Sequence, residues 1–114
     1  MDAELLELHV FREELLLDIP VPAIRFQIKF RTPQKIDRET AKVEMQFHGA
    51  LKTMLGDGAE AYTFEGEEEH FGWMVYSFGY TVGGDTLSES VIDSIAKDPH
   101  KYITARVVWQ EERV

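Results

Sequence analysis

The chain contains no cysteine, and this absence restricts the chemistry open to it. Disulfide bonds, thiolate catalysis and the common structural zinc sites all need that residue. Long hydrophobic runs are also missing, since no stretch approaches the ~20 apolar residues of a membrane-spanning helix. The first residues are acidic, whereas a secretory signal begins with basic ones. We therefore expect a cytoplasmic protein with no membrane partner.

Basic residues are scarce: 12 Lys and Arg stand against 21 Asp and Glu, a formal net charge of −9. Residues 19–56 reverse the balance, with seven bases and three acids. Affinity for duplex nucleic acid comes from neutralising phosphates, so the field of the whole molecule disfavours that partner. The acidic remainder either serves solubility alone or meets a basic protein.

A length of 114 residues indicates one domain, 1–114, with one hydrophobic core. Within it we distinguish an N-terminal segment, 1–22, a folded unit, 23–110, and a tail, 111–114. Residues 3–17 are rich in Leu and Glu, which favours a helix, but part of the segment also alternates as a strand does. Both possibilities stay open.

The clearest pattern is the strict alternation in residues 24–31, which is typical of a half-buried strand. Further strands are expected at 60–65, 71–82 and 102–110, and Met74, Tyr76, Phe78, Tyr80 and Val82 are expected to face the core. Asp37 and the apolar stripe from Val43 to Met54 predict a helix that Gly56 or Gly58 ends, although Val43, Met45 and Phe47 also fit a strand. A second helix is expected after a capping box at Thr86 and Glu89, ending before Pro99. Residues 66–70 are expected to form a loop.

From residue 23 this order is strand, helix, strand, strand, helix, strand. It predicts an α+β, ferredoxin-like (split βαβ) fold: one four-stranded antiparallel sheet with two helices on one face, preceded by an N-terminal helix or an extra strand. The strand at 23–31 would lie in the sheet centre, between the strands at 102–110 and 71–82.

The open face of that sheet is then expected to be basic, with one aromatic at its edge. There are three hypotheses for this face. In one, the acidic first segment folds over it and neutralises it with Glu4, Glu7, Glu13 and Glu14. Otherwise the face associates with the same face of a second copy, or it binds an anion or a single-stranded nucleic acid. The candidate binding residues of the face are Arg25, Lys29, Arg31, Arg106 and Trp73.

An acidic run, Glu67, Glu68 and Glu69, precedes His70 and is a second candidate binding element. The four histidines lack the spacing of a zinc site, and neither a phosphate-binding loop nor a nucleophile elbow occurs. We therefore name no metal ligand, cofactor or catalytic residue.

The leading hypothesis is a small acidic, non-enzymatic protein that acts by contact with another protein, as an adaptor, inhibitor or assembly subunit. Two alternatives remain. One is an anion or single-stranded nucleic-acid binder that uses the basic face. The other is a small homodimeric enzyme, with His48 and His70 among its acid–base candidates at a subunit cleft. A homodimer is compatible with all three hypotheses.

Overall fold

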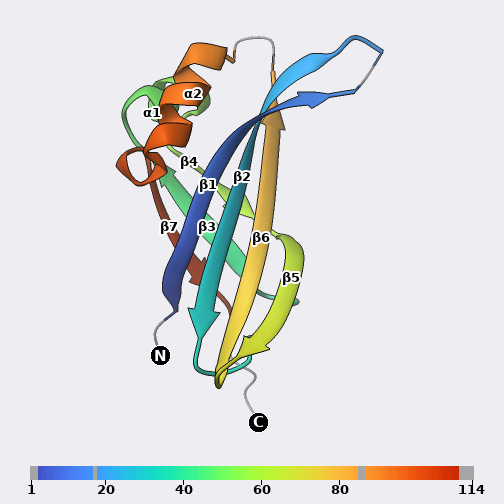
Figure 1. The fold of residues 1–114 in the computed structure, drawn as a ribbon, viewed down its shortest axis with the longest axis vertical. Helices are drawn as coiled ribbons and strands as arrows, with labels where there is room; N and C mark the ends of the chain where they lie inside the picture. Colours follow the sequence, from blue (N-terminus) through green and yellow to red (C-terminus); the bar gives the residue numbers. More distant parts are fainter. Residues whose placement is uncertain (1–2, 17, 85–86, 111–114) are drawn as a thin grey trace.

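The computed structural model describes residues 3–16, 18–84 and 87–110, and this part of the chain forms two antiparallel sheets (Figure 1). Sheet A has the order β1-β2-β6-β5, and sheet B has the order β4-β3-β7. The strands of sheet A are β1 (Glu4–Leu15), β2 (Val21–Thr32), β6 (Trp73–Gly83) and β5 (Thr63–His70). Those of sheet B are β4 (Gly58–Ala61), β3 (Lys42–Phe47) and β7 (Ile103–Val108).

The core lies between the two sheets. Strand β2 buries Ile24, Phe26, Ile28 and Phe30, as its alternation predicts. Phe26 stacks on Phe47 of sheet B with 5.7 Å between ring centroids. The side of β6 expected to face the core does so: Tyr76 and Phe78 are fully buried, and Met74, Tyr80 and Val82 pack against the core.

The sheets are joined directly on one side, because only Tyr62 separates β4 of sheet B from β5 of sheet A. On the other side lie β1 and β7, each the outer strand of its sheet. The 3-10 helix η1 (Pro99–Lys101) contacts both of these strands. The described part of the chain is thus a two-sheet β structure that is continuous along one side.

Two α-helices, α1 (Gly49–Leu55) and α2 (Glu89–Lys97), lie together at one end of the molecule (Figure 1). The predicted second helix corresponds to α2, which buries Ile92 and Ile95 and packs beside β1. Its cap is Ser88, whose Oγ accepts a hydrogen bond from the Val91 amide at 3.5 Å; Thr86 lies outside the described residues. None of the helices described has the length and apolar character that a bilayer crossing needs.

The predicted ferredoxin-like fold is wrong. The molecule has two sheets, and its helices do not cover one face of a four-stranded sheet. The expected neighbours β2 and β6 do pair, as do β6 and β5. The last strand, however, pairs with β3, while β1 occupies the position beside β2.

Three segments account for the difference. The N-terminal segment is strand β1, in which Leu8 and Val10 turn inward, so the strand alternative was the right one. The stripe from Val43 to Met54 divides into strand β3 and the short helix α1. Residues 66–70 are part of β5 and not a loop. In each case pairing with another strand outweighed the local pattern: β1 pairs with β2, β3 with β7, and β5 with β6.

Candidate functional site

The outer face of sheet A carries a row of bases between two rows of acids. Arg25, Lys29 and Arg31 project from β2, and each is ion-paired. Arg31 Nη2 lies 2.6 Å from Glu4 Oε2, and Lys29 Nζ lies 3.2 Å from Glu7 Oε2, both across the β1–β2 pairing. Arg25 pairs with Glu65 of β5. Sheet A thus neutralises its own basic strand with acids of β1 and β5, and not through a segment folded over the face.

Arg25 and Glu65 come from strands that are not neighbours, and Gly79 of β6 lies between them. A Cβ at Gly79 would collide with the Glu65 carboxylate and would lie 3.1 Å from Arg25 Nη2. Arg25 Nη1 also donates to Thr81 Oγ1 at 3.2 Å. The glycine therefore keeps open the path along which this ion pair crosses β6.

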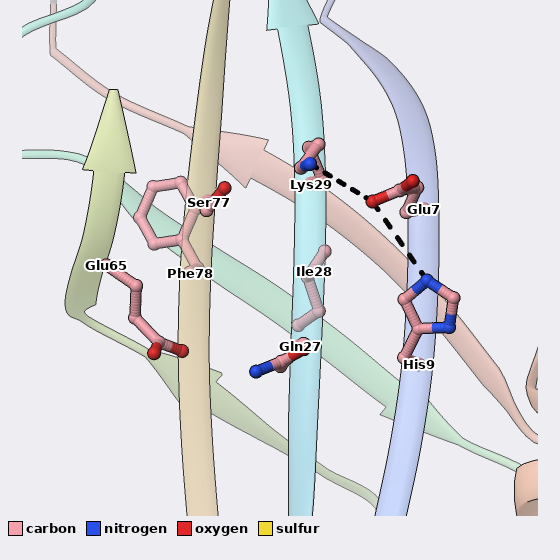
Figure 2. A pocket seen from close by; sticks show the side chains of 8 residues that line it. All are labelled: Glu7, His9, Gln27, Ile28, Lys29, Glu65, Ser77 and Phe78. Carbon is pink, nitrogen blue, oxygen red and sulfur yellow. Dashed lines mark ion pairs between the residues drawn. The ribbon is translucent and has the colours of Figure 1, made fainter. Parts of the chain in front are cut away.

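A shallow depression lies in the middle of this outer face (Figure 2). Its volume is about 170 Å³, which is below the ~300 Å³ at which small-molecule sites begin. From the sequence, Lys29 was expected on this face and Glu7 near it, but His9 and Ser77 were not expected beside them. Alternation places such side chains on one face, but only the strand order brings them together. The depression suits a surface contact better than an enclosed ligand.

Arg106 does not belong to this face. It lies on the outer side of sheet B, where its Nε donates to Glu44 Oε1 at 2.8 Å. Its expected position beside Arg25 required β7 to pair with β2, and β7 pairs with β3 instead. The structure brings together Arg25, Lys29 and Arg31 and leaves Arg106 apart from them.

Trp73 lies at the end of the basic row, where sequence analysis expected an aromatic. The guanidinium carbon of Arg31 lies 4.3 Å from the centroid of the Trp73 ring. On the adjacent strand His70 pairs with Trp73, and residues 71 and 72 close the hairpin between them. We call the group His70, Phe71 and Trp73 the aromatic tip.

Phe71 is the most unusual residue of the aromatic tip. Its backbone has φ of 50°, and Gly72 follows with φ of 81°. Positive φ at both central positions is typical of type I′ turns, which favour Asn, Asp and Gly. The Phe71 side chain is nevertheless 92% exposed. Its ring contacts His70 edge-on, with 4.7 Å between centroids.

The three glutamates of β5 are separated by the pleat of the strand. Glu68 is opposite Val75 on the outer face, and Glu67 and Glu69 are opposite Tyr76 and Met74. A register shift between Phe64 and Gly66 turns Glu67 toward Arg38, whose Nη1 lies 3.5 Å away. Glu67 Oε1 is buried and has no hydrogen-bond partner among the described residues.

Tyr76 lies next to Glu67, and its hydroxyl accepts a hydrogen bond from the Ile36 amide at 2.9 Å. Burial raises the pKa of Tyr76 above its usual value of 10.0, because an apolar environment disfavours the phenolate. The bond anchors the chain between β2 and β3, where Ile36 and Ala41 are buried. We therefore assign Tyr76 and its contacts with Ile36 and Glu67 a role in stabilising the core beside β5.

A second polar cluster lies at the β4 edge of sheet B. Lys42 Nζ lies 3.0 Å from Glu60 Oε1, and the Tyr62 hydroxyl donates to the same carboxylate. The hydrogen bonds from Tyr62 and then Lys42 lower the pKa of Glu60. The bond to Glu60 is also the main reason why the pKa values of Lys42 and Tyr62 are raised.

The two histidines named as acid–base candidates do not come together within the described ranges. His48 lies near sheet B, with Nε2 2.9 Å from Thr104 Oγ1, whereas His70 belongs to the aromatic tip of sheet A. No group of three or more His, Asp or Glu within residues 3–16, 18–84 and 87–110 could hold a metal ion. No protein-family model, curated protein or solved structure matches the chain.

Proposed function

We propose that this protein is a non-enzymatic binding protein, acting by contact with another protein in the cytoplasm, and that the aromatic tip is its contact element. The observation that carries the proposal is Phe71: a large apolar side chain, almost fully exposed, at a backbone position that favours glycine or asparagine. Because it is almost fully exposed, this side chain contributes little burial of apolar surface to the stability of the fold. A residue that the fold disfavours and solvent surrounds is best explained by a partner that contacts it.

The surroundings of Phe71 suggest the chemistry of that partner. Trp73 and the stacked Arg31 form a rigid base beside it, and aromatic and Arg side chains are the commonest anchors of protein interfaces. Glu68 and Glu69 of β5 are exposed close by, and the whole chain carries a net charge of −9. A partner with an apolar pocket for Phe71 and basic residues around it would complement this surface.

The two alternative functions have less support. A nucleic-acid or anion binder would use Arg25, Lys29 and Arg31, yet acids of β1 and β5 already pair with all three. An enzyme would need acid–base groups at a common cleft, and His48 and His70 belong to different parts of the molecule.

The proposal is tested with a photo-crosslinking amino acid placed at position 71 in the full chain. In extract of the source cells it should crosslink to a defined protein. The same probe at Tyr62, an exposed aromatic residue immediately before β5 and so at the opposite end of that strand from Phe71, is the matched control and should not label that protein. Equal labelling from both positions, or turnover of a small molecule with a pH profile limited by a histidine, would overturn the proposal.

A further inference from the structure

The turn between β1 and β2 carries an apolar surface at the end of sheet A opposite the aromatic tip. Leu16 is 86% exposed and Ile19 is 76% exposed, and we call these two residues the aliphatic tip. In Figure 1 the hairpin that bears them extends beyond the body of the molecule. Exposed large apolar residues that gather in one place mark contact sites, whereas scattered ones need no explanation.

A cleft between the hairpin and α2 borders the aliphatic tip. Its lining includes Glu13, Glu14, Pro20 and Pro22 of the hairpin and Glu89 of α2. Pro20 directly follows the second residue of the aliphatic tip in the chain, so the cleft begins where the tip ends. The volume of the cleft is about 180 Å³, which is below the ~300 Å³ at which small-molecule sites begin. It therefore suits one long side chain of a partner and not a whole ligand.

The two elements that form the cleft carry almost no positive charge. No Lys or Arg occurs in residues 13–24 of the hairpin or in residues 87–96, which include most of α2. Arg12 lies between these elements, and two acids of α2 already bind it. Its Nη1 is 3.3 Å from Glu89 Oε2, and its Nε is 3.0 Å from Asp93 Oδ1. The single base of the cleft is therefore shared, and the other acids there have no base to offset them.

Glu13 and Glu14 are two of these acids. Neither belongs to an ion pair within the ranges that the structure describes. On the outer face of sheet A, by contrast, Glu4, Glu7 and Glu65 each bind a base of β2. Solvated acids alone indicate only solubility. These two, however, share a cleft with apolar proline rings and lie beside exposed aliphatic side chains, a combination that suits a ligand both basic and apolar.

We propose that this end of the molecule binds a basic, partly apolar segment of another protein. A Lys or Arg of that segment enters the cleft, and apolar side chains next to it cover the aliphatic tip. The methylene groups of the basic side chain lie against Pro20 and Pro22. Its charged head lies among Glu13, Glu14 and Glu89, as is usual for long basic side chains that bury their stems and keep their charge near acids or water.

Charge argues against other occupants of this end. A second copy of the chain would bring a net charge of −9 to it, and a nucleic acid or an anionic lipid surface would bring phosphates. Acids that no base offsets repel all of these. The cleft and the aliphatic tip also lie at the end of sheet A opposite the aromatic tip, so one molecule can hold two partners at once, as an adaptor does.

The test uses a defined probe, a short synthetic peptide of Lys, Leu and Ala, and calorimetry with the full chain. The same peptide with Glu in place of Lys is its control. We expect the Lys peptide to bind, with an affinity that falls as salt is added, and the Glu peptide not to bind. Glu13→Gln with Glu14→Gln should weaken binding at least tenfold. Glu68→Gln with Glu69→Gln removes the same charge at the opposite end of sheet A and should change the affinity less than twofold.

A second pair of variants tests the apolar half of the contact. Leu16→Ser with Ile19→Ser should also weaken binding of the Lys peptide at least tenfold, with an unchanged circular dichroism spectrum, because both side chains are exposed. Failure of the Lys peptide to bind, equal binding of the Glu peptide, or equal losses from the variants at the two ends of sheet A would overturn the proposal. The crosslinking at Phe71 uses another probe at another end, so either proposal can fail without the other.

Discussion

Arg31 lies between two side chains that hold its guanidinium in place: its carbon is 4.3 Å from the centroid of the Trp73 ring, and its Nη2 is 2.6 Å from Glu4 Oε2. Three strands of sheet A are thereby connected at one end, β1 through Glu4, β2 through Arg31 and β6 through Trp73. This end supports the aromatic tip, so its rigidity bears on the contact proposed there.

The stacking of Arg31 on Trp73 should be measurable as an interaction energy. We expect a double-mutant cycle of Arg31→Gln and Trp73→Leu to give a coupling of about 0.5–1 kcal/mol, the usual range for an exposed cation–π pair. Urea unfolding of the wild type, the two single variants and the double variant measures it. Strictly additive effects would contradict the stacking.

Phe71 should be a residue that lowers stability. We expect Phe71→Asn to raise the free energy of unfolding by about 1 kcal/mol, because Asn adopts positive φ more readily than a bulky side chain does. Phe71→Val should lower it, since a β-branched side chain suits that backbone even less. The measurement is urea unfolding, and a Phe71→Asn variant less stable than wild type would mean that the phenyl ring supports the fold.

Gly79 should control the ion pair between Arg25 and Glu65 on the outer face of sheet A. Gly79→Ala should cost less than about 1 kcal/mol, because its Cβ meets the end of the flexible, partly exposed Glu65 side chain, which can move aside and give up the ion pair. Glu65→Ala in the same chain should restore part of this loss. Gly66→Ala is the matched control, since nothing lies within 4 Å of the Cβ it would add. Equal effects at Gly79 and Gly66 would contradict the crossing of Arg25 and Glu65 above β6.

The cluster at the β4 edge should make stability depend on pH. The pKa of Glu60 is lower in the folded protein than its ordinary value of 4.5, so its contribution is present above that pH and is lost as the pH falls through the folded pKa. Lys42 behaves in the opposite sense: its raised pKa gives a contribution present below pH 10.5 and lost as the pH rises further. Glu60→Gln should therefore flatten the acid limb of stability against pH, and Glu68→Gln should leave it steep. The curves come from urea unfolding between about pH 3 and 7.

The basic row should fail as a nucleic-acid site. Because its bases are already ion-paired, we expect no binding of single-stranded oligonucleotide to the wild-type chain at physiological salt, and no change with Lys29→Glu. Fluorescence anisotropy with a labelled oligonucleotide measures this. Tight, salt-sensitive binding that Lys29→Glu abolishes would restore the nucleic-acid alternative.

Strands β2 and β6 could be predicted from the sequence because each alternates over many residues and buries one full face. Strands β1 and β3 could not, since their patterns fit two periods at once. Val43, Phe47 and Leu51 recur every four residues, as in a helix, although Val43 and Phe47 belong to a strand and Leu51 to the helix after it. Choosing between strand and helix for these residues requires knowing which strands pair with each other, and a local sequence pattern does not contain that information.

The candidate site was predicted in part for the same reason. Alternation placed Arg25, Lys29 and Arg31 on one face, but their acidic partners depend on the strand order. Phe71 was assigned to a strand and missed as a contact residue. The available signal was Phe71-Gly72 between two alternating segments, a two-residue turn with one residue that such turns disfavour.

The most direct test of the proposed function is the affinity for the protein that crosslinks at position 71, measured by calorimetry with purified wild-type chain and with Phe71→Asn. The account predicts that the more stable variant binds at least tenfold more weakly, because the exposed ring is the anchor of the contact. Equal dissociation constants for the two chains would contradict it and would leave the exposure of Phe71 unexplained.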